Sequence, residues 1–294
     1  MYHKLPESDK IGSEMSTRSP RDRYIKVGNI NTRFWAAGDK GTAVVLVHGL
    51  GGSIENWVYN IDALAQHHRV YAMDLVGFGR SEKPPLTHNI NVLVRFINDF
   101  METQRIEKTS LVGNSLGGGL VLQFAIDFPG KVKKLVLVDN AGMGRAVILD
   151  FKVASIPIIG ELLTMPSRKG AARVWKKIVY DSSLVTDELV EEGYGLITLP
   201  GARKSLLAAL RAGINLGGQR AGLVDLLISR LGTITAPTLI TWGQQDRILP
   251  LAHAHIAAKK IPSARLHIFD RCGHMPQFEH PEEFNKLVLD FLAK

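Results

Sequence analysis

The chain has 294 residues, of which 45% are hydrophobic and 22% are charged, a balance that excludes a disordered or fibrous protein. Lysine and arginine number 36 against 28 acidic residues, which gives a net charge of +8. The basic residues are scattered and are not interleaved with aromatic ones, so we expect no nucleic-acid partner. The single cysteine, Cys272, excludes an internal disulfide, and no apolar run approaches the ~18 residues that span a bilayer. We expect a cytoplasmic protein with no membrane span.

The predicted elements alternate along most of the chain. Residues 1–21 are polar and lack periodicity, which predicts a flexible tail. Strands are predicted over 23–27, 32–36, 43–48, 69–74, 110–114, 134–139, 238–242 and 265–269. Helices are predicted over 54–67, 91–102, 116–128 and 251–260, and from 281 onward. This alternation predicts an α/β fold, with a mostly parallel sheet that carries helices on both faces.

The alternation stops between about residues 143 and 231. That stretch is helix-rich, is broken by Pro157, Pro166 and Pro200, and is too long for a loop. We therefore predict a helical cap over 143–231, inserted into a core made of 22–142 and 232–294. The apolar composition of this cap predicts that it shapes the substrate pocket.

The sharpest local signal is the sequence G-N-S-L-G at residues 113–117, which lies after a predicted strand and before a predicted helix. This context is typical of a nucleophile elbow, in which Ser115 occupies a tight, strained turn. Flanking residues without side chains allow such a turn to close. The turn places the serine oxygen at the carboxyl edge of the sheet, so we expect Ser115 to be a nucleophile.

A serine hydroxyl needs a base to take its proton. His274 follows the predicted strand at 265–269, and Asp246 follows the strand before it, so both reach the same edge of the sheet. We predict His274 as the base and Asp246 as the acid that orients it. Asp139, which ends another strand, is the rival acid. Asp74 is disfavoured, because its surroundings are typical of a turn in which the carboxylate caps backbone groups.

The oxyanion formed during attack needs two hydrogen-bond donors. We assign them to the backbone N–H groups of Leu116 and Leu50, the latter in the glycine-rich loop after the strand at 43–48. The side chain of His48 is expected to organise this loop. Further candidates for contact with the substrate are His48, Gly49, Asn114 and Met275. The sequence shows no metal-ligand set and no phosphate loop, so we expect no cofactor or metal.

These motifs resemble the α/β-hydrolase family. The resemblance runs over about residues 24–294 and rests on V-H-G-L-G-G, D-L-V-G-F-G-R-S, G-N-S-L-G-G, W-G-Q-Q-D-R-I-L-P and C-G-H-M-P-Q-F-E-H-P. It implies an eight-stranded core with the cap over the site. It also implies Ser115 as nucleophile, His274 as base and Asp246 as acid. A serine at position 115 disfavours the branches that use a nucleophilic aspartate.

Within the family, the segments around Ser115 and His274 look like the C–C hydrolases of meta-cleavage pathways. Those enzymes usually carry a G-P-G-type oxyanion loop and a tryptophan after the histidine, where this chain has Leu50 and Met275. An acidic dienone substrate would also need a cation, for which Arg203 and Arg211 are candidates. We therefore expect a serine esterase for small or medium carboxylic esters, acting through an acyl-enzyme.

The alternatives are a C–C hydrolase of meta-cleavage products and, third, a ligand receptor on the same fold. The partner expected in each case is a small molecule, an ester or other acyl compound for the enzymes. Both a monomer and a homodimer remain open.

Overall fold

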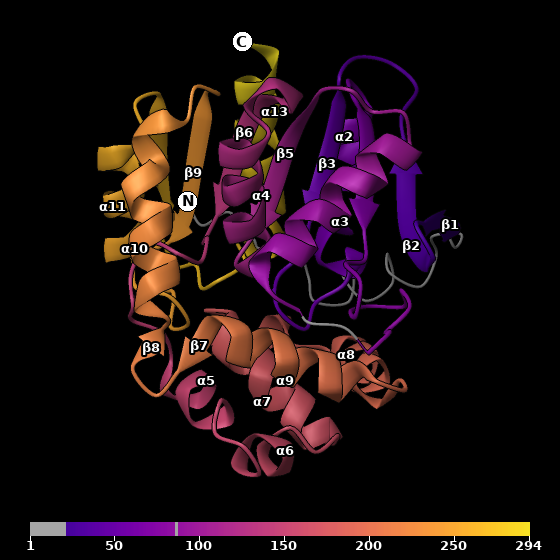
Figure 1. Cartoon of the computed structure of the whole chain (residues 1–294), viewed down its shortest axis with the longest axis vertical. Helices are drawn as coiled ribbons and strands as arrows, with labels where there is room; N and C mark the ends of the chain where they lie inside the picture. Colours follow the sequence, from indigo (N-terminus) through magenta and orange to yellow (C-terminus); the bar gives the residue numbers. More distant parts are fainter. Residues whose placement is uncertain (1–21, 86–87) are drawn as a thin grey trace, which may run out of the picture.

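A computed structural model describes residues 22–85 and 88–294, and the predicted tail at 1–21 lies outside this range. Its centre is an eight-stranded sheet in the order β1-β2-β4-β3-β5-β6-β9-β10 (Figure 1). β1 and β2 pair antiparallel, as do β2 and β4, and the other neighbours are parallel. The strands are β1 (Arg23–Val27), β2 (Ile30–Ala37), β3 (Ala43–Val47), β4 (Arg69–Met73), β5 (Thr109–Asn114), β6 (Val132–Val138), β9 (Thr238–Gly243) and β10 (Ala264–Phe269).

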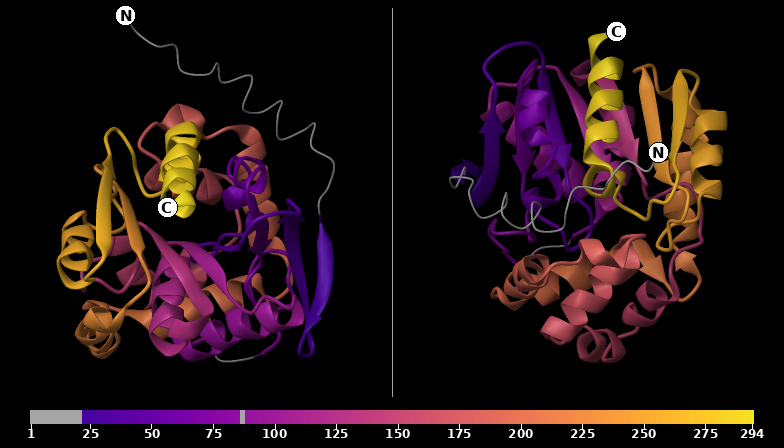
Figure 2. Two further views of the ribbon diagram at one scale, coloured as in Figure 1. Left: turned by 90° about the horizontal axis from the view of Figure 1, so that it is seen from above. Right: turned by 180° about the vertical axis from the view of Figure 1, so that it is seen from behind.

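Helices cover both faces of this sheet, as the alternation predicts (Figures 1 and 2). The helices of the core are η1 (Ile54–Trp57), α2 (Ile61–Ala65), α3 (Ile90–Thr103), α4 (Leu116–Asp127), η2 (Pro129–Lys131), η4 (Leu231–Thr233), α11 (Ala252–Lys260), α12 (Pro276–Glu279) and α13 (Pro281–Ala293). No helix among the described residues is both long and apolar enough to cross a membrane.

Burial on both faces follows from the alternation of side chains along each strand. In β3, Val45 and Val47 join the apolar core that also holds side chains of α3, α4 and α11. Val44 and Leu46 point the other way, into the core shared with α2 and α13. An uninterrupted apolar strand such as β3 is therefore required at the centre of the sheet.

The stretch predicted as a cap contains helices and a two-stranded hairpin that the sequence did not suggest. Its elements are α5 (Leu149–Ala154), α6 (Ile159–Leu163), α7 (Arg168–Ile178), η3 (Ser182–Leu184), α8 (Asp187–Thr198), α9 (Ala202–Gly213), β7 (Ile214–Asn215), β8 (Gly218–Gln219) and α10 (Ala221–Arg230). Helices α5 to α9 lie together as a layer beneath the sheet, whereas α10 runs back beside the core (Figure 1). Leu227 of α10 is part of the main apolar core.

One predicted helix is wrong in its extent. The segment 54–67 is not one helix but η1 and α2, separated by a turn at Asn60. The side chain of Asn60 is fully buried, and its Nδ2 donates to the Gln277 carbonyl oxygen and to Asn285 Oδ1, each at 2.9 Å. A continuous helix through residue 60 would move this side chain away from both partners. The two long-range hydrogen bonds therefore favour the turn.

Contacts of the backbone explain the glycines around Ser115. A Cβ on Gly117 would lie 2.3 Å from the Val47 carbonyl oxygen and 2.5 Å from that of His48. A Cβ on Gly113 would lie 2.4 Å from the Gly117 carbonyl oxygen. The start of α4 therefore packs directly on the end of β3, and only residues without side chains permit this approach.

We expect Gly117→Ala to destabilise the fold by about 1–3 kcal/mol, because the added methyl overlaps backbone that cannot move freely. Gly222→Ala is the matched control, since Gly222 is also the second residue of a helix but has no atom within 4 Å of its Cβ position. There the change should stabilise by roughly 0.5–1 kcal/mol. Urea unfolding of both variants measures the difference, and equal effects would contradict the proposed close approach.

Candidate active site

Ser115 occupies a strained turn between β5 and α4. Its φ of 56° and ψ of −118° lie in a region that residues with side chains rarely adopt. The turn is held from three sides: Ser115 N donates to the Val138 carbonyl oxygen, and the Ser115 carbonyl oxygen accepts from Gly119 N and Ala141 N. Such strain persists only where the surroundings fix it, and here they set the serine at the carboxyl edge of the sheet.

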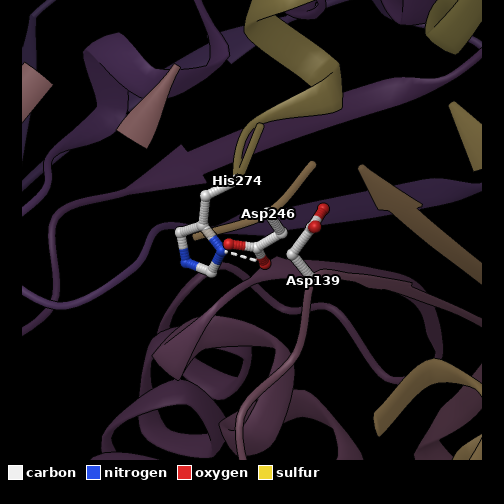
Figure 3. Close-up of side chains that lie close together, drawn as sticks. All are labelled: Asp139, Asp246 and His274. Carbon is white, nitrogen blue, oxygen red and sulfur yellow. Dashed lines mark hydrogen bonds and ion pairs between the residues drawn. The ribbon is translucent and has the colours of Figure 1, made fainter. Parts of the chain in front are cut away.

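His274 and Asp246 form the hydrogen bond expected of a base and its orienting acid (Figure 3). His274 Nδ1 lies 2.7 Å from Asp246 Oδ2, and the histidine is 5% exposed. Asp246 Oδ1 accepts from the backbone N–H groups of Ile248 and Leu249. These two bonds fix the carboxylate, so that Nδ1 is the donor nitrogen and Nε2 is left to accept a proton.

Backbone contacts tie His274 to the turn at Ser115 and to the helical layer below. Asn114 Nδ2 donates to the His274 carbonyl oxygen at 3.1 Å and to the Val138 carbonyl oxygen at 3.3 Å. His274 N donates to the Ile178 carbonyl oxygen at 2.7 Å. Asn114, a residue that the sequence suggested as a substrate contact, thus uses its side-chain nitrogen to hold the backbone of His274.

The glycine-rich loop after β3 lies against the serine. A Cβ on Gly49 would be 3.1 Å from Ser115 Cβ, so Gly49 borders the nucleophile. Within the described part of the chain, the amides of Leu50 and Leu116 donate no hydrogen bond. Both N–H groups are therefore available to a ligand, and their role as oxyanion donors stays a prediction.

His48 is fully buried, and both its ring nitrogens contact the backbone. Nδ1 lies 2.8 Å from the Gly49 carbonyl oxygen, and Nε2 lies 3.1 Å from Leu75 N. A ring that donates from Nδ1 and accepts at Nε2 is neutral, and burial lowers the pKa of His48 to about 4. Neither nitrogen remains for a substrate, so the contact proposed for His48 is corrected to a role in shaping the loop.

Met275 is 3% exposed and belongs to a small apolar cluster with Val179, Leu189 and Phe278. Its sulfur also lies 3.8 Å from Asn56 Nδ2. The side chain of Met275 therefore packs the histidine loop onto neighbouring helices.

Glu279 is a residue of the site that sequence reasoning missed. Its Oε1 accepts from Gly273 N at 2.9 Å and from Met275 N at 3.3 Å, while Oε2 accepts from Tyr180 N at 2.6 Å. Glu279 thus holds the segment that carries His274 against residue 180 of the helical layer. Burial raises its pKa. Its position five residues after the histidine, on a one-turn helix, is the only sequence signal that could have found it.

Asp74 and Asp139, the two other aspartates considered as the acid that orients His274, lie in different surroundings. Asp74 accepts from Ile54 N and Arg80 N at 2.8 and 2.7 Å, which confirms that it caps backbone groups. Asp139 is fully buried beside the pair, and one ligand atom each of Asp139, Asp246 and His274 lie within 4.8 Å of one another. The hydrogen bond to His274 is made by Asp246, as predicted.

The neutral state of His48 makes the stability of the fold sensitive to acid. Its pKa is depressed in the folded chain, so its contribution is complete above the ordinary value of 6.5 and is lost as the pH falls towards 4. We expect this loss to be on the order of 3 kcal/mol. Urea unfolding at pH 7.5 and pH 4.5 should show a smaller pH difference for His48→Gln than for the wild type. The exposed His255 gives the control, since His255→Gln should keep the full difference.

Comparison with known proteins places this geometry in a family. The family described as alpha/beta hydrolase fold matches residues 42–155 and 200–281. The chain is 35% identical over 261 residues to a 2-hydroxy-6-oxononadienedioate/2-hydroxy-6-oxononatrienedioate hydrolase of Comamonas testosteroni, covering 86% of this chain and 88% of that protein. It is 34% identical over 261 residues to a 2-hydroxy-6-oxo-6-phenylhexa-2,4-dienoate hydrolase of Burkholderia cepacia, with the same coverage.

A solved structure agrees with these relatives. A mutant of the meta-cleavage product hydrolase from Pseudomonas fluorescens IP01, complexed with acetates, superposes with a TM-score of 0.80 at 30% identity. The match covers 92% of this chain and 97% of that one. The eight-stranded, mostly parallel sheet agrees with these matches, which also span the segments that carry Ser115, Asp246 and His274. The chain therefore belongs to the α/β-hydrolase fold family, in its serine hydrolase branch.

Proposed function

We propose that this protein hydrolyses a carbon–carbon bond of a 2-hydroxy-6-oxo-dienoate, the class of compound named for its relatives. The ester substrate predicted from the sequence is overturned by those relatives, whose names describe dienoate hydrolases. The observation that carries the proposal is their similarity, 32–35% identity over 86–99% of the chain, together with the Asp246–His274 pair beside the Ser115 turn.

The chemistry of such a substrate suits this site. Moving the enol proton from the 2-hydroxyl group to C5 gives a 2,6-diketone, in which the C6 carbonyl can be attacked. When the C5–C6 bond then breaks, its electron pair is delocalised onto the oxygen at C2. The fragment that contains C5 therefore leaves as an enolate. The acyl group that remains on the enzyme is released by water as a carboxylic acid.

The residues take the roles that a carbonyl attack requires. Ser115 Oγ forms the bond to C6, and His274 Nε2 receives the serine proton while Asp246 stabilises the resulting imidazolium. The amides of Leu50 and Leu116 receive the negative oxygen at C6. His274 returns its proton to the departing carbon fragment and then activates the water.

The substrate carboxylate needs a cation or several donors in a desolvated pocket. Of the two candidates from the sequence, Arg211 is occupied, because its guanidinium makes two 2.7 Å bonds to the Glu161 carboxylate. Arg203 donates from Nη2 to the Glu161 carbonyl oxygen, but its Nε is buried and has no partner among the described residues. Arg203 is therefore the better of the two candidates for the substrate carboxylate.

The helical layer is proposed to be a cap that selects the substrate. Its link to the catalytic machinery is direct, since the Ile178 carbonyl oxygen accepts from His274 N and Tyr180 N donates to Glu279. Residues of the cap thereby help to hold the base, and its apolar side chains suit the carbon skeleton of a dienoate.

A substrate comparison tests the proposed function. We expect kcat/KM for 2-hydroxy-6-oxo-6-phenylhexa-2,4-dienoate to exceed that for nitrophenyl butyrate by at least about 10-fold, or ~1.4 kcal/mol in transition-state binding. Loss of dienoate absorbance and formation of benzoate report the reaction. A preference for the ester of similar size would contradict the proposal.

Replacing the nucleophile separates chemistry from binding. Ser115→Ala should lower the turnover of the dienoate by about 10⁴–10⁶-fold, because the base then has no hydroxyl to activate. Ser110→Ala, in the same strand, should change it by no more than a few-fold. A fluorophosphonate should label Ser115 alone, as mapped by mass spectrometry. A label on another serine would show that the nucleophile is wrongly assigned.

A further inference from the structure

Asp139 is a buried acid beside the catalytic pair that the mechanism above does not use. Asp139 directly follows β6, has a positive φ of 43° and is 0% exposed. Its N–H donates to the Thr241 carbonyl oxygen at 3.0 Å, which fixes its backbone to β9. Figure 3 shows Asp246 between His274 and Asp139, so that the two carboxyl groups are neighbours.

Two ionised carboxylates this close, both buried, repel each other strongly, so one of them holds a proton. The donors around each group decide which one. Asp246 accepts three hydrogen bonds, from Ile248 N, Leu249 N and His274 Nδ1. Asp139 accepts one, from Gly243 N at 3.0 Å to Oδ1, and its Oδ2 receives none from any described residue. The negative charge is therefore better stabilised on Asp246.

We propose that Asp139 is a neutral carboxylic acid that donates a hydrogen bond from Oδ2 to the Asp246 carboxylate and thereby positions the catalytic acid. In this arrangement every oxygen of the two carboxyl groups has a partner, and the cluster keeps a single negative charge for His274. Asp139 touches neither substrate nor nucleophile, so it is a positioning residue that acts through Asp246. The inference rests on the hydrolase site proposed above, and it holds for any bond that the site cleaves.

The surroundings of Asp139 favour its neutral form. Burial first, and then the charge of Asp246, raise its pKa well above the ordinary range, and the contact with Gly243 N opposes this only in part. Glu279 adds further negative charge nearby. The titratable groups that face this acid from the loops after β9 and β10 and from α12 are Asp246, His274, Cys272 and Glu279.

Infrared spectroscopy can detect the proton directly. The difference spectrum between the wild type and Asp139→Asn at neutral pH should contain the carbonyl stretch of a protonated carboxylic acid, shifted in D₂O. The subtraction removes contributions from other buried acids such as Asp74 and Glu279, which both samples retain. Absence of this band would overturn the proposal. This readout does not depend on the substrate, so it stands apart from a failure of the proposed C–C hydrolysis.

The same band tests the coupling to Asp246. In Asp246→Asn, Asp139 loses its charged neighbour, so its carboxyl group should ionise at a distinctly lower pH than in the wild type. An Asp139 that is not coupled to Asp246 would titrate at the same pH in both proteins. An unchanged titration would therefore contradict the proposed hydrogen bond.

Reactivity of the nucleophile tests the positioning role. Asp139→Leu keeps the branched shape of the side chain but removes the donor, and should slow phosphonylation of Ser115 by roughly 10-fold, because a hydrogen bond to a charged group is lost. Asp139→Asn restores an uncharged donor and should recover most of that rate. Asp246→Asn should be slower by about 10⁴-fold. If Asp139→Asn were as slow as Asp246→Asn, Asp139 would need its charge, and the proposal would be wrong. A rate for Asp139→Leu equal to that of the wild type would also overturn it.

Discussion

The active site depends on the close approach between the start of α4 and the end of β3. Gly117 packs on the carbonyl oxygens of Val47 and His48 with no space for a methyl group. This approach closes the turn at Ser115 and brings Gly49 against the serine. These contacts and the hydrogen bonds around Ser115 stabilise its strained backbone, so the turn at Ser115 and the glycine-rich loop form one rigid unit.

The base joins this unit through buried hydrogen bonds to the backbone. Asn114 holds the His274 carbonyl oxygen from the elbow, and the Ile178 carbonyl oxygen holds the His274 amide from the helical layer. The three segments are far apart in the sequence, so the site exists only when the core and the layer are assembled. A change in the packing of the layer would therefore alter the position of His274.

The central sheet, the strained turn at Ser115 and the pairing of Asp246 with His274 could be predicted, because each depends on local patterns. The residues 43–47 are apolar throughout, and Ser115, Asp246 and His274 each follow a strand of the sheet. Features set by long-range contacts could not be predicted in this way. The break at Asn60 depends on Asn285, and the role of Glu279 depends on Tyr180. The residues within either segment do not indicate which distant residue the segment will contact.

The wrong choice between ester and C–C cleavage has a similar origin. Both reactions begin with attack of a serine on a carbonyl carbon, so Ser115, His274 and Asp246 are compatible with either. The sequence argument for an ester relied on the need of an acidic substrate for a cation, on the Leu50 loop, and on Met275 as an apolar contact beside His274. In the structure, the methionine side chain packs with Phe278 and Val179 and contacts Asn56, so its identity reflects the packing of the histidine loop. A dienoate differs from an ester in its leaving carbon and its carboxylate, and the directions of side chains that could recognise either feature are set only when the chain folds.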